Sequence, residues 1–556
     1  MHRCGVYLST VFLFLVVVVF SSSPCSATNN VRVFNTTFVN TTRLPLKILG
    51  IFGHFGKSHF DVFKPLLEEL ARRGHQVTVI SYFPRSESAK AKESLPTYKD
   101  ISICDPAINY VNIIDLHMIK HNVFRPLYEL IMLRFMANTA CKVGLNHPAI
   151  KEFLRSDEKF NLIITEAFNT DCFLGFVHRF KTPYISLSSH QIMPWINKDI
   201  GNEDNPSYIP NVFLGLSRPI NLINRLLNTV VLLLTKLAYE YWFRFHDQSI
   251  ANEVFGPDLP DLRKISKQVQ AILLNTHSSL HGSVPLLPNV VEIGGLHISP
   301  RVNPLPKDIA EFLDNAHEGV LYFNLGSMIK MSTMPQKNLD AIFDVLSSIP
   351  RKVIWKWESD VLSRKLDNVM TKKWLPQLDV LSHPNVKVYM GHGGLLGLSE
   401  GVYTGVPMVL IPMFGDQFYN SAAAKNRGIA EVIAFNELDE HSLRRALDKI
   451  FNDTSYFENA QRLSKAFRDR PATPLETAVW WTEYIARGNG GSYLHSYAAD
   501  VVWYQYYHID FALISIIVIA LLIYIIYRLI KLLLWLLHAV KGMLGSGTKK
   551  TNKKED

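Results

Sequence analysis

The sequence predicts an α/β protein with two doubly wound domains that face a cleft, followed by one C-terminal transmembrane helix. Three observations carry this prediction. Each half of the chain alternates short apolar segments, typical of buried parallel strands, with segments of helical periodicity. The 556 residues exceed what one hydrophobic core usually holds. A charge-free apolar stretch stands near the C-terminus and is followed by basic residues.

The first domain is expected over residues 28–285 and opens with a strand, a helix and a second strand. Residues 47–52 are short and apolar, residues 60–73 have helical spacing, and residues 76–81 are β-branched and apolar. This order is typical of a βαβ unit. A further strand is expected at residues 161–165.

The second domain is expected over residues 286–490, because the sequence turns rich in Pro and Gly near its start. The strands expected after this boundary are residues 319–325, 353–357, 386–390 and 408–411. Ligands of doubly wound sheets bind outside the carboxyl ends of the strands. Chemistry is therefore expected in the cleft where the two sheets face each other.

The first 27 residues are predicted to be a cleaved secretory signal. Arg3 precedes an apolar run at residues 6–20, and small residues end at Ala27. The chain after this signal would enter the lumen, where N-glycosylation is possible. The sequons on that side are Asn35, Asn40 and Asn452.

One membrane span is predicted at residues 511–531. Its first part, residues 511–527, is apolar and free of charge, aromatic residues precede it, and Arg528 and Lys531 follow it. That length is at the short limit of the roughly 17–25 residues that a span needs, but flanking basic residues can reach the interface. The alternative is a buried core helix, which the lysine-rich tail disfavours.

The tail, residues 532–556, is predicted to be cytosolic. From Arg528 onward the chain carries seven Lys or Arg and two acidic residues, which is +5 of the formal net charge of +9. Such an excess favours the cytosolic side, and it removes high pI as an argument for nucleic-acid binding. Lys553 and Lys554 resemble a dilysine signal for retrieval to the endoplasmic reticulum; a solvated charge run is the alternative.

Cysteine usage leaves the redox state open. Cys4 and Cys25 lie in the predicted signal, which leaves Cys104, Cys141 and Cys172 in the mature chain. These three allow one disulfide and one thiol, or no disulfide, and their spacing fits no metal site.

Residues 374–417 contain the pattern of a nucleotide-diphosphate site. The strand at 386–390 is followed by the turn His392-Gly393-Gly394, which opens a helix that ends at Gly405. A helix N-terminus offers unpaired N–H groups, and glycines let a pyrophosphate approach the backbone. Trp374 can stack on a base, and Glu400, about two turns into the helix, can accept from ribose hydroxyls.

Taken together, these motifs resemble the signature of the UDP-glycosyltransferase family, which transfers a sugar from a UDP-sugar to a small acceptor. The resemblance covers residues 47–531, including a final helix after Pro474. It implies two Rossmann-like domains of GT-B type, a UDP-sugar donor and a small lipophilic acceptor. The matching motifs are Trp374-x-Pro376-Gln377, His392-x-Gly394, Glu400, Gly405-Val406-Pro407 and Asp416-Gln417-x-x-Asn420.

The resemblance also implies a catalytic histidine and an acid that orients it. The family's base stands at the Ser-His position, which is His59 here rather than His54. Histidine ordinarily titrates near neutrality, which suits abstraction of the acceptor proton. The family usually has Asp at the strand end where this chain has Glu166, so Glu166 is placed first and Asp171 second as the partner of His59.

The donor-side roles are likewise those that the resemblance implies. Ser327 and Gly394 would contact the phosphates with His392, and Gln377 would bind the nucleoside beside Trp374 and Glu400. Asp416 and Gln417 would bind sugar hydroxyls, and Asn420 completes the motif on the donor side. Many members have Asn at Leu396, and the Leu-Leu pair here is similar to invertebrate members that use UDP-glucose, so glucose is favoured over glucuronate. No Asp-x-Asp pair stands in a plausible position, so neither a metal nor another cofactor is expected.

The sequence thus predicts an inverting hexosyltransferase of the endoplasmic reticulum membrane, of type I topology with a lumenal catalytic part. A non-catalytic protein that binds UDP-sugar or a lipophilic ligand is the main alternative, and a single-span receptor is a second one. Oligomeric state stays open, with a homo-oligomer possible. The apolar residues 213–241 are interrupted by polar ones and are too short to span a bilayer, so they are interpreted as a helix over the acceptor side, a helix on the membrane surface or a core helix.

Overall fold

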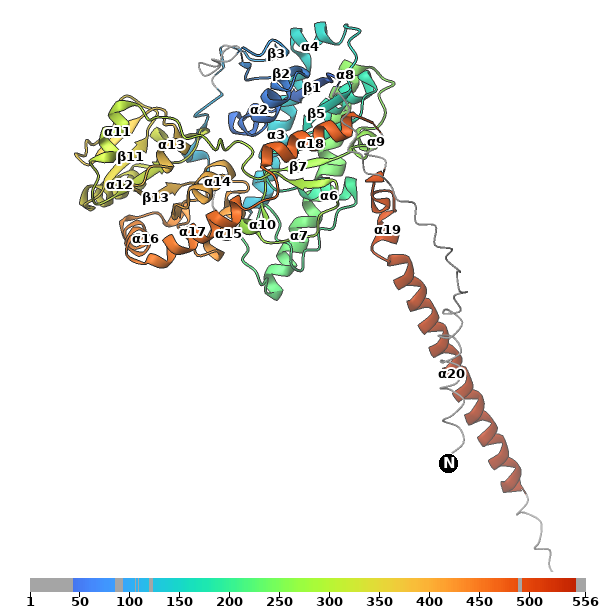
Figure 1. Cartoon of the computed structure of the whole chain (residues 1–556). Coiled ribbons are helices and arrows are strands. Elements are labelled where there is room, and N and C mark those ends of the chain that lie inside the picture. The colour runs from blue at the N-terminus through green and yellow to red at the C-terminus, as the bar shows by residue number, and fades with distance from the viewer. Residues whose placement is uncertain are drawn as a thin grey trace, which may run out of the picture. The chain divides into compact units, whose positions relative to one another are not determined.

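The computed structural model describes residues 44–85, 94–105, 107–108, 110–119, 124–488 and 493–546. The predicted signal at 1–27, the sequons at Asn35 and Asn40, and Lys553 and Lys554 lie outside these residues. Two parallel sheets dominate the described chain (Figure 1).

The first sheet has seven strands in the order β3-β2-β1-β5-β6-β7-β8, and every pair is parallel. Its strands are β1 Lys47–Phe52, β2 Gln76–Ser81, β3 Tyr98–Ser102, β5 Leu162–Glu166, β6 Tyr184–Ser188, β7 Ile272–Leu274 and β8 Val290–Glu292. The predicted bounds of the first two strands agree with the structure, in which each strand is buried after its first residue. Strand β8 lies beyond the domain boundary predicted at 285/286, yet it extends the first sheet.

The helices of the first half connect these strands and cover both faces of the sheet, with apolar cores on each side. They are α2 Lys57–Arg72, α3 Arg125–Asn146, α4 Pro148–Phe153, α5 Gly175–Phe180, α6 Pro194–Ile200, α7 Leu222–Ala238, α8 Arg244–Phe255, α9 Leu262–Ser266 and α10 Ser278–His281. A π-helical turn, Tyr239–Phe243, joins α7 to α8.

The second sheet has six strands in the order β12-β11-β9-β13-β14-β15, again all parallel. They are β9 Val320–Asn324, β11 Lys352–Lys356, β12 Val369–Lys372, β13 Val386–Gly391, β14 Met408–Leu410 and β15 Ala430–Val432. The helices around them are α11 Lys307–Asp314, α12 Gln336–Ser348, α13 Gln377–Leu381, α14 Leu395–Thr404, α15 Gln417–Asn426, α16 Glu440–Asn452 and α17 Thr454–Arg468.

A strand pair and a helix are among the contacts that join the halves. Strand β4, Ile114–Asp115, pairs with β10, Ile329–Lys330, so a residue pair of the first half is hydrogen-bonded to the second. Helix α18, Pro474–Ala486, packs against α2, and its apolar side chains join the core of the first sheet. The predicted final helix therefore returns to the first half.

Helix α20, Ile509–Ser546, follows the short α19, Trp503–Tyr506. Its residues Ile509–Leu544 are a candidate membrane span, within which an 18-residue window has a mean hydropathy of 2.9. The helix continues beyond the span predicted at 511–531, because the apolar residues 532–537 extend it into the predicted tail. Its 38 residues measure about 57 Å at 1.5 Å each, which exceeds the thickness of a bilayer's hydrocarbon core.

Candidate active site

His59 lies at the carboxyl edge of the first sheet with a carboxylate beside it. Strand β1 ends at Phe52, and α2 begins five residues later, which puts His59 in its first turn. The neighbouring strand β5 ends at Glu166, whose Oε1 lies 2.6 Å from Nδ1 of His59. Because the carboxylate holds Nδ1, Nε2 is the ring nitrogen that is free to accept a proton.

Ser189 is a second partner of this imidazole. Its Oγ lies 3.0 Å from Nδ1 of His59, directly after strand β6. Sequence reasoning missed it, although a serine just beyond a strand neighbouring β5 carries the positional signal that identified Glu166. The ring of Phe168 covers the same imidazole at a centroid distance of 4.8 Å, so an aromatic wall stands beside the polar pair.

His54 differs from His59 in its surroundings. It is buried, and burial together with the charges of His59 and His190 holds its pKa well below the usual value. Its Nδ1 accepts a hydrogen bond of 3.0 Å from the amide of Gly56, so its imidazole supports the turn before α2.

His54, His59 and Glu166 each place a possible ligand atom within 4.8 Å of the others. The two rings are stacked, at 4.4 Å between centroids, and the Nδ1 atoms are occupied by Gly56 and Glu166. Stacked rings do not aim their lone pairs at one point, so this arrangement does not fit a tetrahedral metal centre. That transfer needs no metal stays a prediction.

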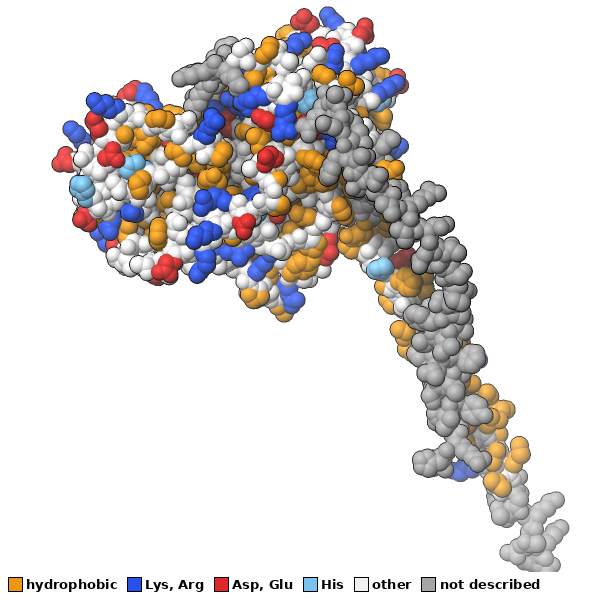
Figure 2. Space-filling view, in the orientation of Figure 1, with side chains coloured by type: hydrophobic (Ala, Val, Ile, Leu, Met, Phe, Trp, Pro, Cys, Tyr) orange, Lys and Arg blue, Asp and Glu red, His pale blue; other side chains and the backbone are white. Residues whose placement is uncertain are grey.

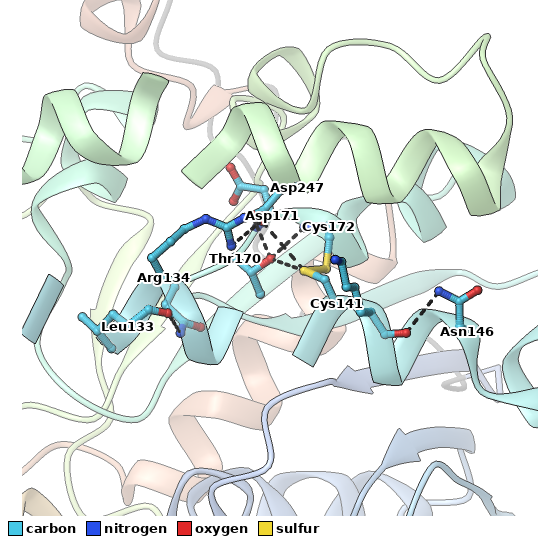
Figure 3. Close-up of a disulfide and its surroundings, with 10 residues drawn as sticks. Leu133, Arg134, Cys141, Asn146, Thr170, Asp171, Cys172 and Asp247 are labelled. Atoms are coloured by element: carbon cyan, nitrogen blue, oxygen red, sulfur yellow. Dashed lines mark hydrogen bonds and ion pairs between the residues drawn. A yellow bond between two sulfur atoms is a disulfide. The ribbon is translucent and has the colours of Figure 1, made fainter. Parts of the chain in front are cut away.

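Asp171, the second predicted partner of His59, is engaged elsewhere. Its Oδ2 accepts from Nε of Arg244 at 2.7 Å, and the same guanidinium also binds Asp199 and Glu240. The amide of Asp171 donates to Asp247, whose pKa is raised to about 7 by burial (Figure 3). The assignment of Asp171 as the orienting acid is therefore wrong.

A disulfide explains where Asp171 lies. Cys141 of α3 is bonded to Cys172, with a Cα–Cα distance of 6.0 Å, and the two sulfurs lie beside Asp171 in Figure 3. The chain after β5 is thus attached to α3 and placed against α8, which carries Arg244. Of the pairings that the sequence left open, the structure has Cys141–Cys172, and Cys104 lies outside this disulfide.

A cavity of about 410 Å³ opens at the carboxyl ends of the second sheet's strands and is also lined by His59 and Ser189. This volume is ordinary for a small-molecule site. Most of the predicted donor-side residues line it, namely Ser327, Trp374, Gln377, His392, Gly394, Glu400, Asp416 and Gln417.

The turn before α14 requires its glycines. Gly393 has φ +79°, a left-handed conformation that favours glycine. A Cβ on Gly394 would lie 2.4 Å from Nε2 of His392, so glycine makes room for that ring. Burial lowers the pKa of His392 to about 4, and its Nδ1 is buried without a partner. A neutral imidazole and the first amides of α14 thus face the cavity together, as an anion site requires.

Gln377 and Glu400 form one hydrogen-bonded unit. Gln377 Nε2 donates to Glu400, and its Oε1 accepts from the hydroxyl of Tyr322 at 2.8 Å and from Asn324 Nδ2 at 2.6 Å. Burial raises the pKa of Glu400 to about 7. In this structure Gln377 therefore fixes the carboxylate of Glu400. Trp374 stands at the rim with 55% of its surface exposed, which leaves its ring face open to a base.

Asn420 does not line the cavity, so its predicted contact with the donor is wrong. It is fully buried, and its Nδ2 donates to the carbonyl of Gly393 at 3.0 Å and to Asp416 Oδ2 at 2.9 Å. Its Oδ1 accepts from Gln191 of the first half at 2.6 Å. Asn420 thus positions Asp416 and the glycine turn. Gln417 Oε1 likewise accepts from the amides of Met413 and Phe414, which shapes the same loop.

Lys356 is a cation at the cavity that sequence reasoning missed. It is the last residue of β11 and is buried, and its Nζ donates to the carbonyl of Gly326 at 2.7 Å and to Asn112 Oδ1 at 3.0 Å. Its charge contributes to the low pKa of His392. A lysine that ends an otherwise apolar strand was the available signal, because buried charges need a partner or a ligand.

Helix α3 of the first half reaches the loop that carries Asp416. Glu129 Oε1 accepts from the amide of Gly415 at 3.1 Å and from Arg125 at 3.3 Å. The Arg125 guanidinium lies 3.4 Å from the centroid of the Phe418 ring. Burial raises the pKa of Glu129 to about 7. The two halves are therefore in direct contact beside Asp416.

The sequence of this chain is similar to those of known proteins. Residues 51–543 match the family model described as "UDP-glucoronosyl and UDP-glucosyl transferase". The chain is 36% identical over 494 residues to UDP-glycosyltransferase UGT5 of Dactylopius coccus, with 87% of this chain and 92% of that protein covered. It is 34% identical over 468 residues to UDP-glucosyltransferase 2 of the same organism, with coverage of 84% and 88%.

A solved structure shares the fold. A UDP-glucosyltransferase from Polygonum tinctorium is similar at a TM-score of 0.52 with 14% identity, over 81% of this chain and 100% of that one. This likeness confirms the predicted GT-B arrangement of two doubly wound domains. The family match over most of the sequence and the two relatives from Dactylopius coccus identify the chain as an enzyme that transfers sugar from a UDP-sugar. The chain therefore belongs to the UDP-glycosyltransferase family.

Proposed function

We propose that this enzyme transfers a hexose, glucose rather than glucuronate, from its UDP-sugar to a hydroxyl of a small lipophilic acceptor, with inversion to a β-glycoside. The observation that carries the proposal is the His59–Glu166 pair, because His59 lines the same cavity as Gly394 and the start of α14 while Glu166 holds its Nδ1. The aromatic ring of Phe168 beside His59 suits an apolar acceptor.

In the proposed step, Nε2 of His59 takes the proton of the acceptor hydroxyl while the oxygen attacks C1 of the sugar. The bond from C1 to the β-phosphate oxygen breaks, and UDP leaves with its electron pair. Glu166 stabilises the imidazolium that forms, and such a base contributes about 10²–10⁴-fold. His392, Lys356 and the amides of α14 stabilise the charge on UDP.

The preference for glucose is supported by Leu396 in the cavity wall and by the glucosyl relative of Dactylopius coccus. The test is a comparison of UDP-glucose, UDP-glucuronate and UDP-galactose with a panel of phenols, alcohols and steroids, using microsomes that contain the full chain. We expect kcat/KM to be at least about tenfold higher with UDP-glucose. Equal or faster transfer from UDP-glucuronate would reverse the donor assignment.

Metal-independence forms part of the proposal, because the cationic and N–H groups around the cavity can supply the electrostatic stabilisation. Transfer should keep its rate when EDTA is added to the full-length enzyme. A loss that Mg²⁺ or Mn²⁺ restores would contradict this expectation.

We further propose that the enzyme is a type I protein of the endoplasmic reticulum membrane, with α20 as its anchor. Asn452 is exposed at the end of α16 on the proposed lumenal side. Replacing Lys553 and Lys554 by Ala should let the protein reach the Golgi, where its glycans gain resistance to endoglycosidase H. Glycans that stay sensitive in this variant would place the retention signal elsewhere.

Two donor-side variants should separate base binding from sugar binding. Trp374→Ala should lower the affinity for UDP and for UDP-glucose equally, because both lose the same base stacking. A loss of roughly 1–3 kcal/mol corresponds to about 5- to 150-fold in affinity. Asp416→Ala should leave UDP affinity nearly unchanged and reduce kcat/KM for UDP-glucose. Isothermal titration and initial rates measure the two effects, and a matching loss of UDP affinity in both variants would contradict the separate roles.

Removing the hydrogen bond between Glu129 of α3 and the amide of Gly415 should lower the rate of transfer without lowering the affinity for UDP. Glu129→Ala leaves the amide of Gly415 without its acceptor, so the loop that holds Asp416 is less well fixed, and we expect kcat to fall about tenfold, roughly 1.4 kcal/mol. Glu129→Gln is the matched control because its amide oxygen can still accept. UDP affinity should match the wild type in both variants, and an unchanged kcat in Glu129→Ala would show that the contact has no such role.

A further inference from the structure

Helix α7 buries polar side chains and exposes apolar ones, the reverse of an ordinary surface helix. Its buried side includes Asn228 and Thr235, which are 1% and 2% exposed, beside Val231 and Leu232. Its outer side, which we call the α7 face, is a stripe of aliphatic side chains between 41% and 78% exposed. These are Leu222, Ile223, Leu226, Leu227, Val230, Leu233, Leu234 and Leu237.

The hydrogen bonds of a buried polar side chain fix the rotation of α7 about its own axis. Asn228 Nδ2 donates to the carbonyls of Pro206 and Ile209, each at 2.8 Å, and its Oδ1 accepts from the amide of Asn211 at 2.7 Å. Rotating the helix would break all three bonds. The same bonds tie α7 to the 206–211 segment. The continuous helix Leu222–Phe255, which begins with α7, is long and apolar enough to cross a membrane, but a spanning position of α7 would break these bonds.

The surroundings of α7 point to what covers its outer side. Lys236 near its C-terminal end forms an ion pair of 2.5 Å with Asp204. Burial raises the pKa of Tyr506 and Tyr507, which stand immediately before α20, and the charge of the nearby Asp204 adds to this rise. The segment that enters α20 therefore lies close to the end of α7.

That entering segment is itself attached to the first half. The carbonyl of Ala499 accepts from Lys267 Nζ at 2.6 Å, and a Cβ on Gly201 would meet the amide of Ala499 at 2.5 Å. Trp503, Tyr506 and Tyr507 are exposed aromatic residues of the type found at membrane interfaces. The α7 face is thus continuous with the place where the chain enters its anchor, and Figure 2 shows hydrophobic side chains gathered around α7.

We propose that the α7 face lies in the lipid–water interface of the bilayer that α20 enters, as a second membrane contact of this enzyme. A helix with one apolar face and low charge on that face binds in this way, parallel to the surface. Arg225, exposed beside the stripe, is placed to meet lipid phosphate. Of the three interpretations of residues 213–241, the proposal adopts the membrane surface.

The first test uses the wild-type full chain in vesicles of phosphatidylcholine and phosphatidylethanolamine that contain a lipid-soluble carbene photolabel. Mapping by mass spectrometry should find label on α20 and, at helical spacing, on Ile223, Leu226, Val230 and Leu237. The buried positions Val231 and Leu232 should stay unlabelled. Label confined to α20 would overturn the proposal, and label on both sides of α7 would indicate a spanning helix instead.

The second test measures the contact without the anchor. A protease site placed after His508 in the full chain is cut once the protein is in vesicles, and sedimentation reports whether the part before the cut stays bound. Leu226→Ser with Leu233→Ser and Leu237→Ser should lower the bound-to-free ratio by about tenfold or more. The matched control, Val302→Ser with Val361→Ser and Phe457→Ser, changes equally exposed apolar residues of the second half and should bind as the wild type does.

Complete release of the wild type after cleavage would overturn the proposal. So would efficient cross-linking of the α7 faces of two chains within the vesicles, because a second copy would then cover the stripe. UDP affinity of the triple variant checks that it folds, and if that variant is unfolded, the labelling pattern of the wild type decides.

Discussion

His59→Ala should reduce kcat by about 10²–10⁴-fold, roughly 3–5.5 kcal/mol, while UDP affinity changes little. The reason is geometric. Nδ1 of His59 is held by Glu166 and Ser189, which leaves Nε2 as the basic atom at the cavity, whereas the residues assigned to UDP belong to the second half. Single-turnover rates with UDP-glucose and titration with UDP measure the two quantities.

Two controls make this result specific to proton transfer. His59→Gln retains a hydrogen-bonding side chain for Glu166 but has no basic nitrogen, so it should be as slow as the alanine variant. Added imidazole should raise the rate of His59→Ala, whose side chain leaves a space, and leave the wild type unaffected. Transfer by the alanine variant at a near wild-type rate would refute the assignment of the base.

Glu166→Gln and Asp171→Asn should fail in different ways. Glu166→Gln removes the charge that stabilises the imidazolium, so kcat should fall by at least about tenfold, 1.4 kcal/mol, with little change in thermal stability. Asp171→Asn weakens an ion pair with Arg244, which is 4% exposed in its side chain, and should destabilise the fold by about 1–3 kcal/mol.

The remaining folded fraction of Asp171→Asn should transfer sugar at nearly the wild-type kcat, because Asp171 does not touch His59. Thermal unfolding and active-site titration with UDP separate stability from turnover. If Asp171→Asn lowered kcat as Glu166→Gln does, at unchanged stability, the structural assignment of the orienting acid would be wrong.

The sequence predicted those parts of the fold that depend on local pattern. Strands β1 and β2 are apolar runs of ordinary length, and their bounds agree with the prediction. Strands β7 and β8 have three residues each, too few for a periodicity, and they were missed. Strand β14 is as short, but it stands within the motif-rich residues 374–417 and was predicted. Helix α20 was predicted too short because the basic residues at 528 and 531 were taken as its end, although the apolar residues after them continue it.

In the site, residues predicted from strand ends and turn glycines take their predicted places: His392 lines the cavity, and Glu166 contacts His59, which also lines it. The wrong assignments involve partners distant in sequence. Asp171 binds a side chain 73 residues later and Asn420 binds one 229 residues earlier, and neither distance leaves a local pattern. Which side of α7 packs inward was equally undetermined, because its polar side chains satisfy carbonyls of a loop that has no recognisable motif.

Helix α18 determines how the chain as a whole is assembled. It follows the second sheet in sequence but contributes Ala478, Val479 and Ile485 to the core of the first, and His75 lies 3.4 Å from its Glu483. The second half is therefore an insertion into the first, entered after β8 and left before Pro474. If the gene were divided between β8 and α11, the first fragment would lack α18. We expect that fragment to fold only when the other fragment supplies residues 474–486. The anchor therefore follows α18, which is part of the acceptor half. The nucleotide half is connected to that half by two chain segments, one after β8 and one before α18.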